Sequence, residues 1–130
     1  MLNGSELRML NLRSVTAAVF LTTFLMYGGA ASAAEMLTSD QIRTMVSGNT
    51  VQGAMVATGP YAEFYQADGT IKGKDYTGVW GIDGDKMCFQ YGTDPQSCWQ
   101  VGRDGDAVQW IKDGKVEGTG TVVKGNPNNF

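Results

Sequence analysis

The sequence predicts an all-β protein with one short N-terminal helix, built as an antiparallel eight-stranded meander. Apolar and polar residues alternate with period two after residue 50, and turn residues separate the alternating stretches at short intervals. Four of these turns contain an Asp-Gly dipeptide, which favours tight hairpins. Because a meander removes both sheet edges by closing, we expect a small up-and-down, lipocalin-like barrel, with a two-layer β-sandwich as the alternative.

Residues 1–33 have the composition of a secretory signal peptide. Arg8 and Arg13 precede an apolar run over residues 15–27, and Ala31-Ser32-Ala33 fits the small-x-small cleavage rule, with cleavage after Ala34 as an alternative. The run is shorter than the roughly 18 residues that span a bilayer, so we expect no stable membrane anchor after cleavage. Residues 34–130 are then one domain, in the periplasm or secreted.

That domain begins with a helix, expected over about residues 38–47. Thr38 and Gln41 have the spacing of a capping box, and Leu37 and Ile42 occupy the positions of a hydrophobic staple. Gly48 is a natural helix stop. We expect the helix to close one end of the β-structure. The alternative is a detachable arm that inserts into a partner.

Eight strands follow in the predicted meander. We place them at residues 50–58, 61–66, 70–76, 78–82, 86–91, 97–102, 107–111 and 116–124. Cys88 and Cys98 are expected to form a disulfide, because export gives an oxidising environment. A bond between directly paired cysteines centres their hairpin on Thr93 and puts Met87 opposite Trp99.

The tryptophans are expected on the inner face of the barrel. Two-residue turns at Asp83-Gly84 and Asp104-Gly105 pair Trp80 with Met87 and Trp99 with Trp110, so these four side chains form one row. With Phe89 they make the predicted core, or the wall of a pocket, while the cysteines face outward. We expect this row to fill most of the interior. For the last hairpin we favour a three-residue loop, which puts Trp110 opposite Gly118.

A candidate binding surface follows from the hairpin around Asp68-Gly69. A two-residue turn there pairs Tyr61 with Tyr76, Glu63 with Lys74 and Tyr65 with Lys72, and puts Phe64 and Ile71 on the opposite face. The tyrosines and lysines then lie outside the barrel, where tyrosine is a common interface residue. The predicted binding residues are Tyr61, Tyr65, Lys72, Lys74 and Tyr76. The alternative is that these side chains only stabilise the strands.

Composition argues against several function classes. The chain has no histidine, which is the usual general base and the commonest transition-metal ligand. We therefore expect no catalytic residues, no metal and no cofactor. The net charge is −3, and Lys and Arg do not cluster, so no nucleic-acid partner is expected. The sequence predicts a monomeric, non-enzymatic protein of the cell envelope that contacts a protein or an envelope component. A small apolar ligand inside the barrel is the alternative.

Four segments and the leader resemble the small uncharacterised periplasmic proteins of proteobacteria. The segments are Leu-Thr-Ser-Asp-Gln-Ile (37–42), Phe-Tyr-Gln-Ala-Asp-Gly-Thr (64–70), Gly-Val-Trp-Gly-Ile-Asp-Gly-Asp-Lys-Met-Cys (78–88) and Ser-Cys-Trp (97–99). This resemblance implies a compartment and no particular activity. Residues 80–88 are also similar to a segment of the bacterial metalloprotease inhibitors, eight-stranded barrels with one disulfide and an N-terminal arm that plugs the protease cleft. This chain departs from them in having a capped helix in place of the arm and its cysteines on adjacent strands, so periplasmic protease inhibition is an alternative function.

Overall fold

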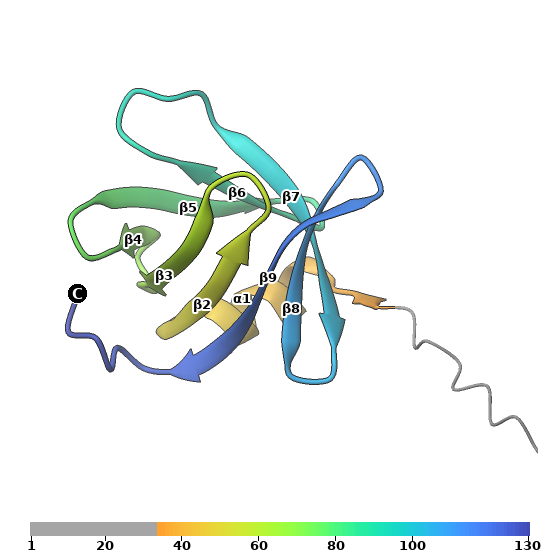
Figure 1. Ribbon diagram of the computed structural model, residues 1–130, viewed down its shortest axis with the longest axis horizontal. Coiled ribbons are helices and arrows are strands. Elements are labelled where there is room, and N and C mark those ends of the chain that lie inside the picture. Colours follow the sequence, from red (N-terminus) through yellow and green to blue (C-terminus); the bar gives the residue numbers. More distant parts are fainter. Residues whose placement is uncertain (1–33) are drawn as a thin grey trace, which may run out of the picture. The chain divides into compact units, whose positions relative to one another are not determined.

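The computed structural model describes residues 34–130, and the predicted signal peptide lies outside these residues. The described chain is mostly β, with one short helix (Figure 1). Its elements are β1 (Glu35–Met36), α1 (Ser39–Val46), β2 (Asn49–Met55), β3 (Gly59–Tyr65), β4 (Thr70–Lys72), β5 (Thr77–Asp83), β6 (Lys86–Gln90), β7 (Ser97–Asp104), β8 (Ala107–Lys112) and β9 (Lys115–Lys124).

Strands β2 to β9 form a closed antiparallel barrel. Each strand pairs with the next one along the chain, and β9 returns to pair with β2. At this closing seam Gly53 lies opposite Gly120, and a Cβ on Gly53 would overlap the carbonyl oxygen of Thr119. The short β1 pairs with the end of β7 that extends beyond β6. The predicted eight-stranded up-and-down barrel is confirmed, with β1 as an extra strand.

Helix α1 closes one end of the barrel, as the sequence predicts. The Thr38 N–H donates to Gln41 Oε1 over 2.9 Å, and the Gln41 N–H donates to Thr38 Oγ1 over 3.4 Å, which completes the capping box. The Ser39 N–H donates to Asp85 Oδ1 in the turn between β5 and β6, over 2.9 Å. Ile42 and Val46 are fully buried. Because the apolar face of the helix is buried in the barrel, a detachable arm finds no support here.

The disulfide hairpin has the predicted register. Cys88 and Cys98 are bonded and lie directly opposite each other on β6 and β7, and Met87 pairs with Trp99. The two cysteines are 10 residues apart, and closing a loop of this size contributes roughly 2–3 kcal/mol on the chain-entropy model.

Two turn predictions are wrong by one residue. Asp83 pairs with Lys86, so the turn is Gly84-Asp85, and the turn between β7 and β8 is likewise Gly105-Asp106. The first residue of each turn is a glycine with φ of 58°, as a type II′ turn requires. Each cross-strand partner therefore moves by two positions: Trp80 faces Phe89, not Met87, and Trp110 faces Val101, not Trp99. A shift of two positions keeps every side chain on its face, so the tryptophans still point inward.

The last hairpin has a shorter turn than predicted, followed by a register irregularity. The turn has two residues, Asp113 and Gly114, both with positive φ (50° and 75°), and Lys112 pairs with Lys115. A register irregularity between Trp110 and Ile111 then restores Trp110 to its position opposite Gly118. The predicted three-residue loop is therefore wrong, whereas the predicted pairing of Trp110 with Gly118 is confirmed.

The tyrosine hairpin is the main correction. Its loop has three residues, 67–69, because the Gln66 N–H donates to the Thr70 carbonyl over 2.8 Å, and Gly69 has a φ of 93°. Tyr65 therefore pairs with Ile71, not with the predicted Lys72. A slip of one residue reverses the faces of a strand, so Tyr65 lies inside the barrel with only 1% of its surface exposed. Its face of β3 is an inner face, not the outer binding surface that the sequence predicts.

Candidate functional site

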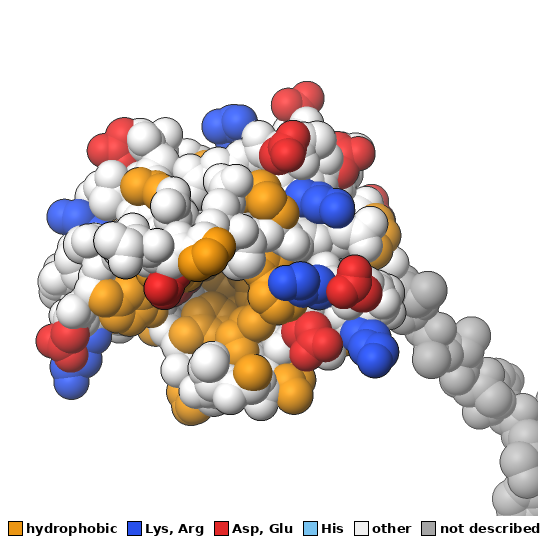
Figure 2. Space-filling model, turned by 90° about the horizontal axis from the view of Figure 1, so that it is seen from above, with side chains coloured by type: hydrophobic (Ala, Val, Ile, Leu, Met, Phe, Trp, Pro, Cys, Tyr) orange, Lys and Arg blue, Asp and Glu red, His pale blue; other side chains and the backbone are white. Residues whose placement is uncertain are grey.

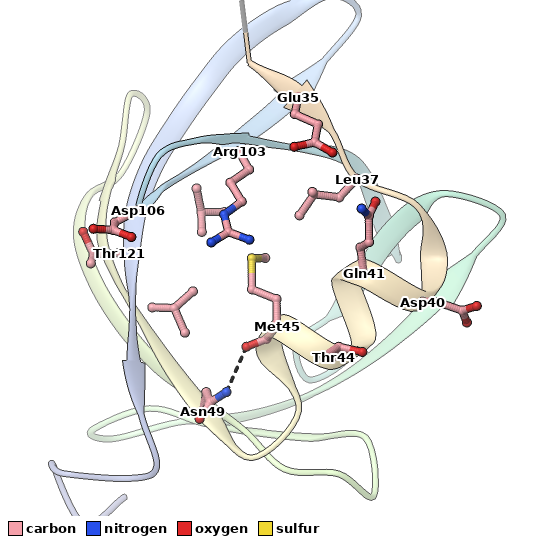
Figure 3. Close-up of a pocket in the computed structure, with 12 residues that line it drawn as sticks. Glu35, Leu37, Asp40, Gln41, Thr44, Met45, Asn49, Arg103, Asp106 and Thr121 are labelled. Carbon is pink, nitrogen blue, oxygen red and sulfur yellow. Dashed lines mark hydrogen bonds between the residues drawn. The ribbon is translucent and has the colours of Figure 1, made fainter.

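The helix end of the barrel carries a polar hollow of about 670 Å³. Figure 3 shows Arg103 and Met45 pointing into it, while Asp40 points away. The Arg103 Nε–H donates to the Gly105 carbonyl over 3.0 Å, and Asn49 Nδ2 donates to the Met45 carbonyl over 2.9 Å. The hollow is lined by residues without an aromatic ring, and these are Glu35, Leu37, Asp40, Gln41, Thr44, Met45, Asn49, Arg103, Asp106, Val108, Thr121 and Val122. The lining carries charges of both signs, and Arg103 and Asn49 already make hydrogen bonds within the chain. This hollow is therefore a weak candidate for a ligand site.

The opposite end of the barrel is open, and it contains an aromatic cavity of about 560 Å³. Figure 2 looks onto this end from above and shows hydrophobic side chains gathered around a hollow. The lining comes from five strands, β2, β3, β6, β7 and β8, and from the loops between strands: Met55, Ala57, Thr58, Pro60, Tyr61, Glu63, Tyr65, Tyr76, Phe89, Tyr91, Asp94, Ser97, Trp99 and Trp110. A concave, aromatic cavity with a few converging polar groups is the usual form of a small-molecule site.

Glu63 is the buried polar centre of this cavity, with 7% of its surface exposed. Three tyrosine hydroxyls donate to its carboxylate: Tyr65 to Oε2 over 2.6 Å, and Tyr76 and Tyr91 to Oε1 over 2.9 and 2.8 Å. Tyr65 is on the same strand as Glu63, whereas Tyr76 and Tyr91 come from the segments before β5 and after β6. The carboxylate therefore ties three parts of the barrel wall together.

The tyrosines of the cavity hold their protons strongly. Burial raises the pKa of Tyr61 to about 12; the hydrogen bond from Trp110 opposes this increase, and the charge of Glu63 adds a smaller increase. Burial, followed by the negative charge of Glu63, raises the pKa of Tyr65, Tyr76 and Tyr91 above the usual value of 10.0. These hydroxyls therefore remain donors at neutral pH.

The indole groups of the cavity also have partners within the chain. Trp110 Nε1 donates to the Tyr61 hydroxyl over 2.7 Å, and that hydroxyl donates to the Thr119 carbonyl over 3.2 Å. Trp99 Nε1 donates to Ser97 Oγ over 3.3 Å. Phe89 meets the Trp110 ring edge to face, with centroids 5.4 Å apart. The rings are thus held in place by hydrogen bonds and by each other.

Glycines beneath the rings set the shape of the wall. The Tyr76 ring lies directly against Gly73, and the Tyr61 hydroxyl lies directly against Gly120, where in each case a Cβ would overlap the tyrosine. A Cβ on Gly78 would lie 2.7 Å from the Tyr91 ring. Each of these tyrosines therefore fills the space that the absent side chain leaves.

The predicted site residues separate into three groups. Tyr61, Tyr65 and Tyr76 line the cavity, but from the inside of the barrel, together with Phe89, Trp99 and Trp110 from the predicted core or pocket wall. Trp80 and Met87 lie outside the cavity in the buried core. Neither Lys72 nor Lys74 lines the cavity; Lys72 lies opposite Phe64, which alternates with the inward Glu63 and Tyr65 along β3.

Sequence reasoning missed Glu63, Tyr91, Met55 and Asp94 as cavity residues. Glu63 was expected in an ion pair with Lys74 on the outer surface. The spacing Tyr61-x-Glu63-x-Tyr65 does place the three side chains on one face, because strand residues alternate. Since tyrosine and glutamate are common on surfaces, the spacing alone did not indicate which face was buried.

The described residues offer no arrangement that suggests a metal centre. No group of three or more His, Cys, Asp or Glu in this part of the chain could hold a metal ion. No helix among residues 34–130 is long and apolar enough to cross a membrane.

No family model, curated protein or solved structure matches the chain. The case for a function therefore depends on the open aromatic cavity.

Proposed function

We propose that this protein is an exported, non-enzymatic binding protein that holds a small molecule in the open end of its barrel. The observation that carries the proposal is the cavity of about 560 Å³, with aromatic walls and Glu63 buried among three tyrosine hydroxyls. Rings fixed in advance lose little entropy when a ligand binds, which favours affinity. The Cys88–Cys98 disulfide is compatible with export to the periplasm or beyond.

Binding inside the barrel has more support than the other functions considered. Contact with a protein or envelope component through the tyrosine hairpin requires outward tyrosines, and Tyr61 and Tyr65 point inward. Protease inhibition through an N-terminal arm requires that segment to be free, and Ile42 and Val46 are fully buried. Both functions remain alternatives without a structural feature that favours them.

The proposal is tested with three probes that share a phenyl ring and a short chain but differ in charge: 2-phenylethylamine, 2-phenylethanol and phenylacetate. Tryptophan fluorescence of the protein purified from an oxidising compartment reports binding, because Trp99 and Trp110 line the cavity. At least one probe is expected to give a saturable change. A native mass spectrum of the same preparation shows whether a small molecule remains bound through purification.

A matched pair of variants locates the binding. Ser97 lines the cavity at the start of β7, whereas Gln100 is exposed further along the same strand. Ser97→Trp should fill the cavity and abolish the saturable response, and Gln100→Trp should leave the response unchanged. Absence of a response to all three probes, or a response that survives in the Ser97→Trp protein, would overturn the proposal.

A further inference from the structure

We infer that the ligand of the open cavity is a small organic cation, with an ammonium group directed toward Glu63 and its carbon atoms against the aromatic walls. This inference rests on the proposed function and specifies the chemical class of the ligand. It is carried by three features of the cavity: the sign of its charges, the direction of its hydrogen bonds, and the aromatic rings of its wall.

The charged residues that line the cavity are all acidic. They are Glu63 and Asp94, and neither lysine nor arginine belongs to the lining. Glu63 is 7% exposed, so its charge acts in a poorly solvated environment, where charge interactions are stronger than in water. A ligand with a positive charge would complement this field, and a carboxylate or phosphate would be repelled by it.

The hydrogen bonds around the cavity leave acceptors and few donors. The hydroxyl groups of Tyr76 and Tyr91 donate hydrogen bonds to Glu63, and that of Tyr61 donates to the Thr119 carbonyl. The N–H groups of Trp99 and Trp110 are also used within the chain. The tyrosine oxygens keep lone pairs, and an ionised carboxylate has about four lone-pair sites, of which Glu63 uses three. An ammonium group supplies the donors that such a surface lacks.

The aromatic faces provide a second mode of recognition. Ammonium groups are attracted to the faces of Trp and Tyr rings, and sets of such rings form cages for methylated amines. Two tryptophans and four tyrosines stand in this wall around the acidic groups: Tyr61, Tyr65, Tyr76, Tyr91, Trp99 and Trp110. The ammonium nitrogen of Lys112 already lies 5.0 Å from the centroid of the Trp99 ring. Lys112 is not part of the lining, so this contact lies outside the cavity and shows that the Trp99 ring pairs with an ammonium group.

The test compares the affinities of the three probes introduced above. At neutral pH, 2-phenylethylamine is a cation, 2-phenylethanol is neutral and phenylacetate is an anion, while the ring and chain length stay the same. One charge-assisted hydrogen bond corresponds to about a tenfold change in affinity, so the amine should bind at least about tenfold tighter than the alcohol. Phenylacetate should bind most weakly. An alcohol or phenylacetate affinity equal to that of the amine would overturn the inference while leaving the proposed function intact.

Two carboxylate variants assign the selectivity to a residue. Glu63→Gln should lower the affinity for 2-phenylethylamine about tenfold or more and leave that for 2-phenylethanol nearly unchanged. Glu117→Gln removes the same charge from β9 outside the cavity and should change neither affinity. An equal loss for both probes in the Glu63→Gln protein would refute a specific role of the charge. If Glu63→Gln does not fold, Asp94→Asn takes its place, because Asp94 is an exposed residue of the lining. This variant should lose less affinity for 2-phenylethylamine than expected for Glu63→Gln. An unchanged affinity for the amine would count against the inference.

Discussion

The two ends of this barrel use their buried side chains in different ways. At the closed end, Leu37, Ile42 and Val46 form an aliphatic core beside the polar hollow, and none of the three titrates. At the open end, rings and a carboxylate surround a cavity and are joined by hydrogen bonds. Apolar packing needs no particular orientation, whereas a carboxylate that accepts hydrogen bonds from three hydroxyl groups fixes each donor in direction. The closed end is suited to stabilise the fold, and the open end to recognise a ligand.

The largest expected difference between the two ends is the effect of alkaline pH on stability, which acts through the tyrosines of the open end. The unfolded chain ionises its tyrosines near pH 10, while Tyr61 in the folded protein has a pKa of about 12, and those of Tyr65, Tyr76 and Tyr91 are also raised. Above about pH 10 the unfolded state therefore releases protons that the folded state retains, so the free energy of unfolding decreases as pH rises toward about 12. Tyr61 alone contributes a loss on the order of 1 kcal/mol at about pH 11.

Urea unfolding at neutral and alkaline pH, combined with the ultraviolet absorbance of tyrosinate, measures this effect. Tyrosinate should appear together with unfolding rather than before it. Glu63→Gln should allow ionisation at lower pH, because it removes the charge that opposes it, whereas Glu117→Gln should not. Ordinary tyrosine titration near pH 10 in a protein that stays folded would contradict the buried network.

At the closed end, truncation of the helix core should reduce stability without affecting recognition. Ile42 is fully buried, so Ile42→Ala leaves a cavity and should cost about 2–5 kcal/mol in urea unfolding. Thr44→Ala, at an exposed position of the same helix, should change stability by less than about 0.5 kcal/mol. The affinity for 2-phenylethylamine, measured where both variants are folded, should equal that of the parent. A changed affinity in the Ile42→Ala protein would show that the two ends are coupled.

The closed end was also the more predictable of the two from the sequence. The capping box of Thr38 and Gln41 and the staple of Leu37 with Ile42 involve neighbours a few residues apart, so local spacing is sufficient to identify them. Along the barrel wall between the two ends, the pairing of Met87 with Trp99 also followed from the sequence, because a disulfide fixes two strands at one point. Strand order and closure followed from the short connections.

At the open end, Phe89, Trp99 and Trp110 were predicted as core or pocket wall, but the inward face of Glu63 could not be predicted because it depends on the length of one loop. A two-residue turn and a three-residue loop around Asp68-Gly69 fit the same dipeptide, yet they place Glu63 on opposite sides of the sheet. The wrongly predicted turns after β5 and β7 did not change which side chains face inward. Each error moved the cross-strand partners by two positions, and such a shift preserves the faces of the strands. The network around Glu63 also joins residues up to 28 positions apart, and no local pattern records such contacts.

The smallest expected effect concerns a single hydroxyl at the open end. Tyr76 is 43% exposed and donates one of the three hydrogen bonds to Glu63, and its ring lies against Gly73. Tyr76→Phe keeps the ring and removes the donor, so urea unfolding should detect a loss of about 1 kcal/mol. Thr38→Ala, which removes the helix cap at the closed end, should cost a similar amount.

The two variants should differ in their affinity for 2-phenylethylamine. Without the Tyr76 hydroxyl, one lone pair of Glu63 Oε1 becomes free to accept a hydrogen bond from an ammonium group. The amine should therefore bind to Tyr76→Phe at least as tightly as to the parent, although the variant is less stable. Thr38→Ala should leave the affinity unchanged, because Thr38 is not part of the cavity. A clear loss of amine affinity in the Tyr76→Phe protein would mean that the hydroxyl itself contacts the ligand. Its oxygen, rather than the freed carboxylate position, would then be the acceptor at that point of the cavity.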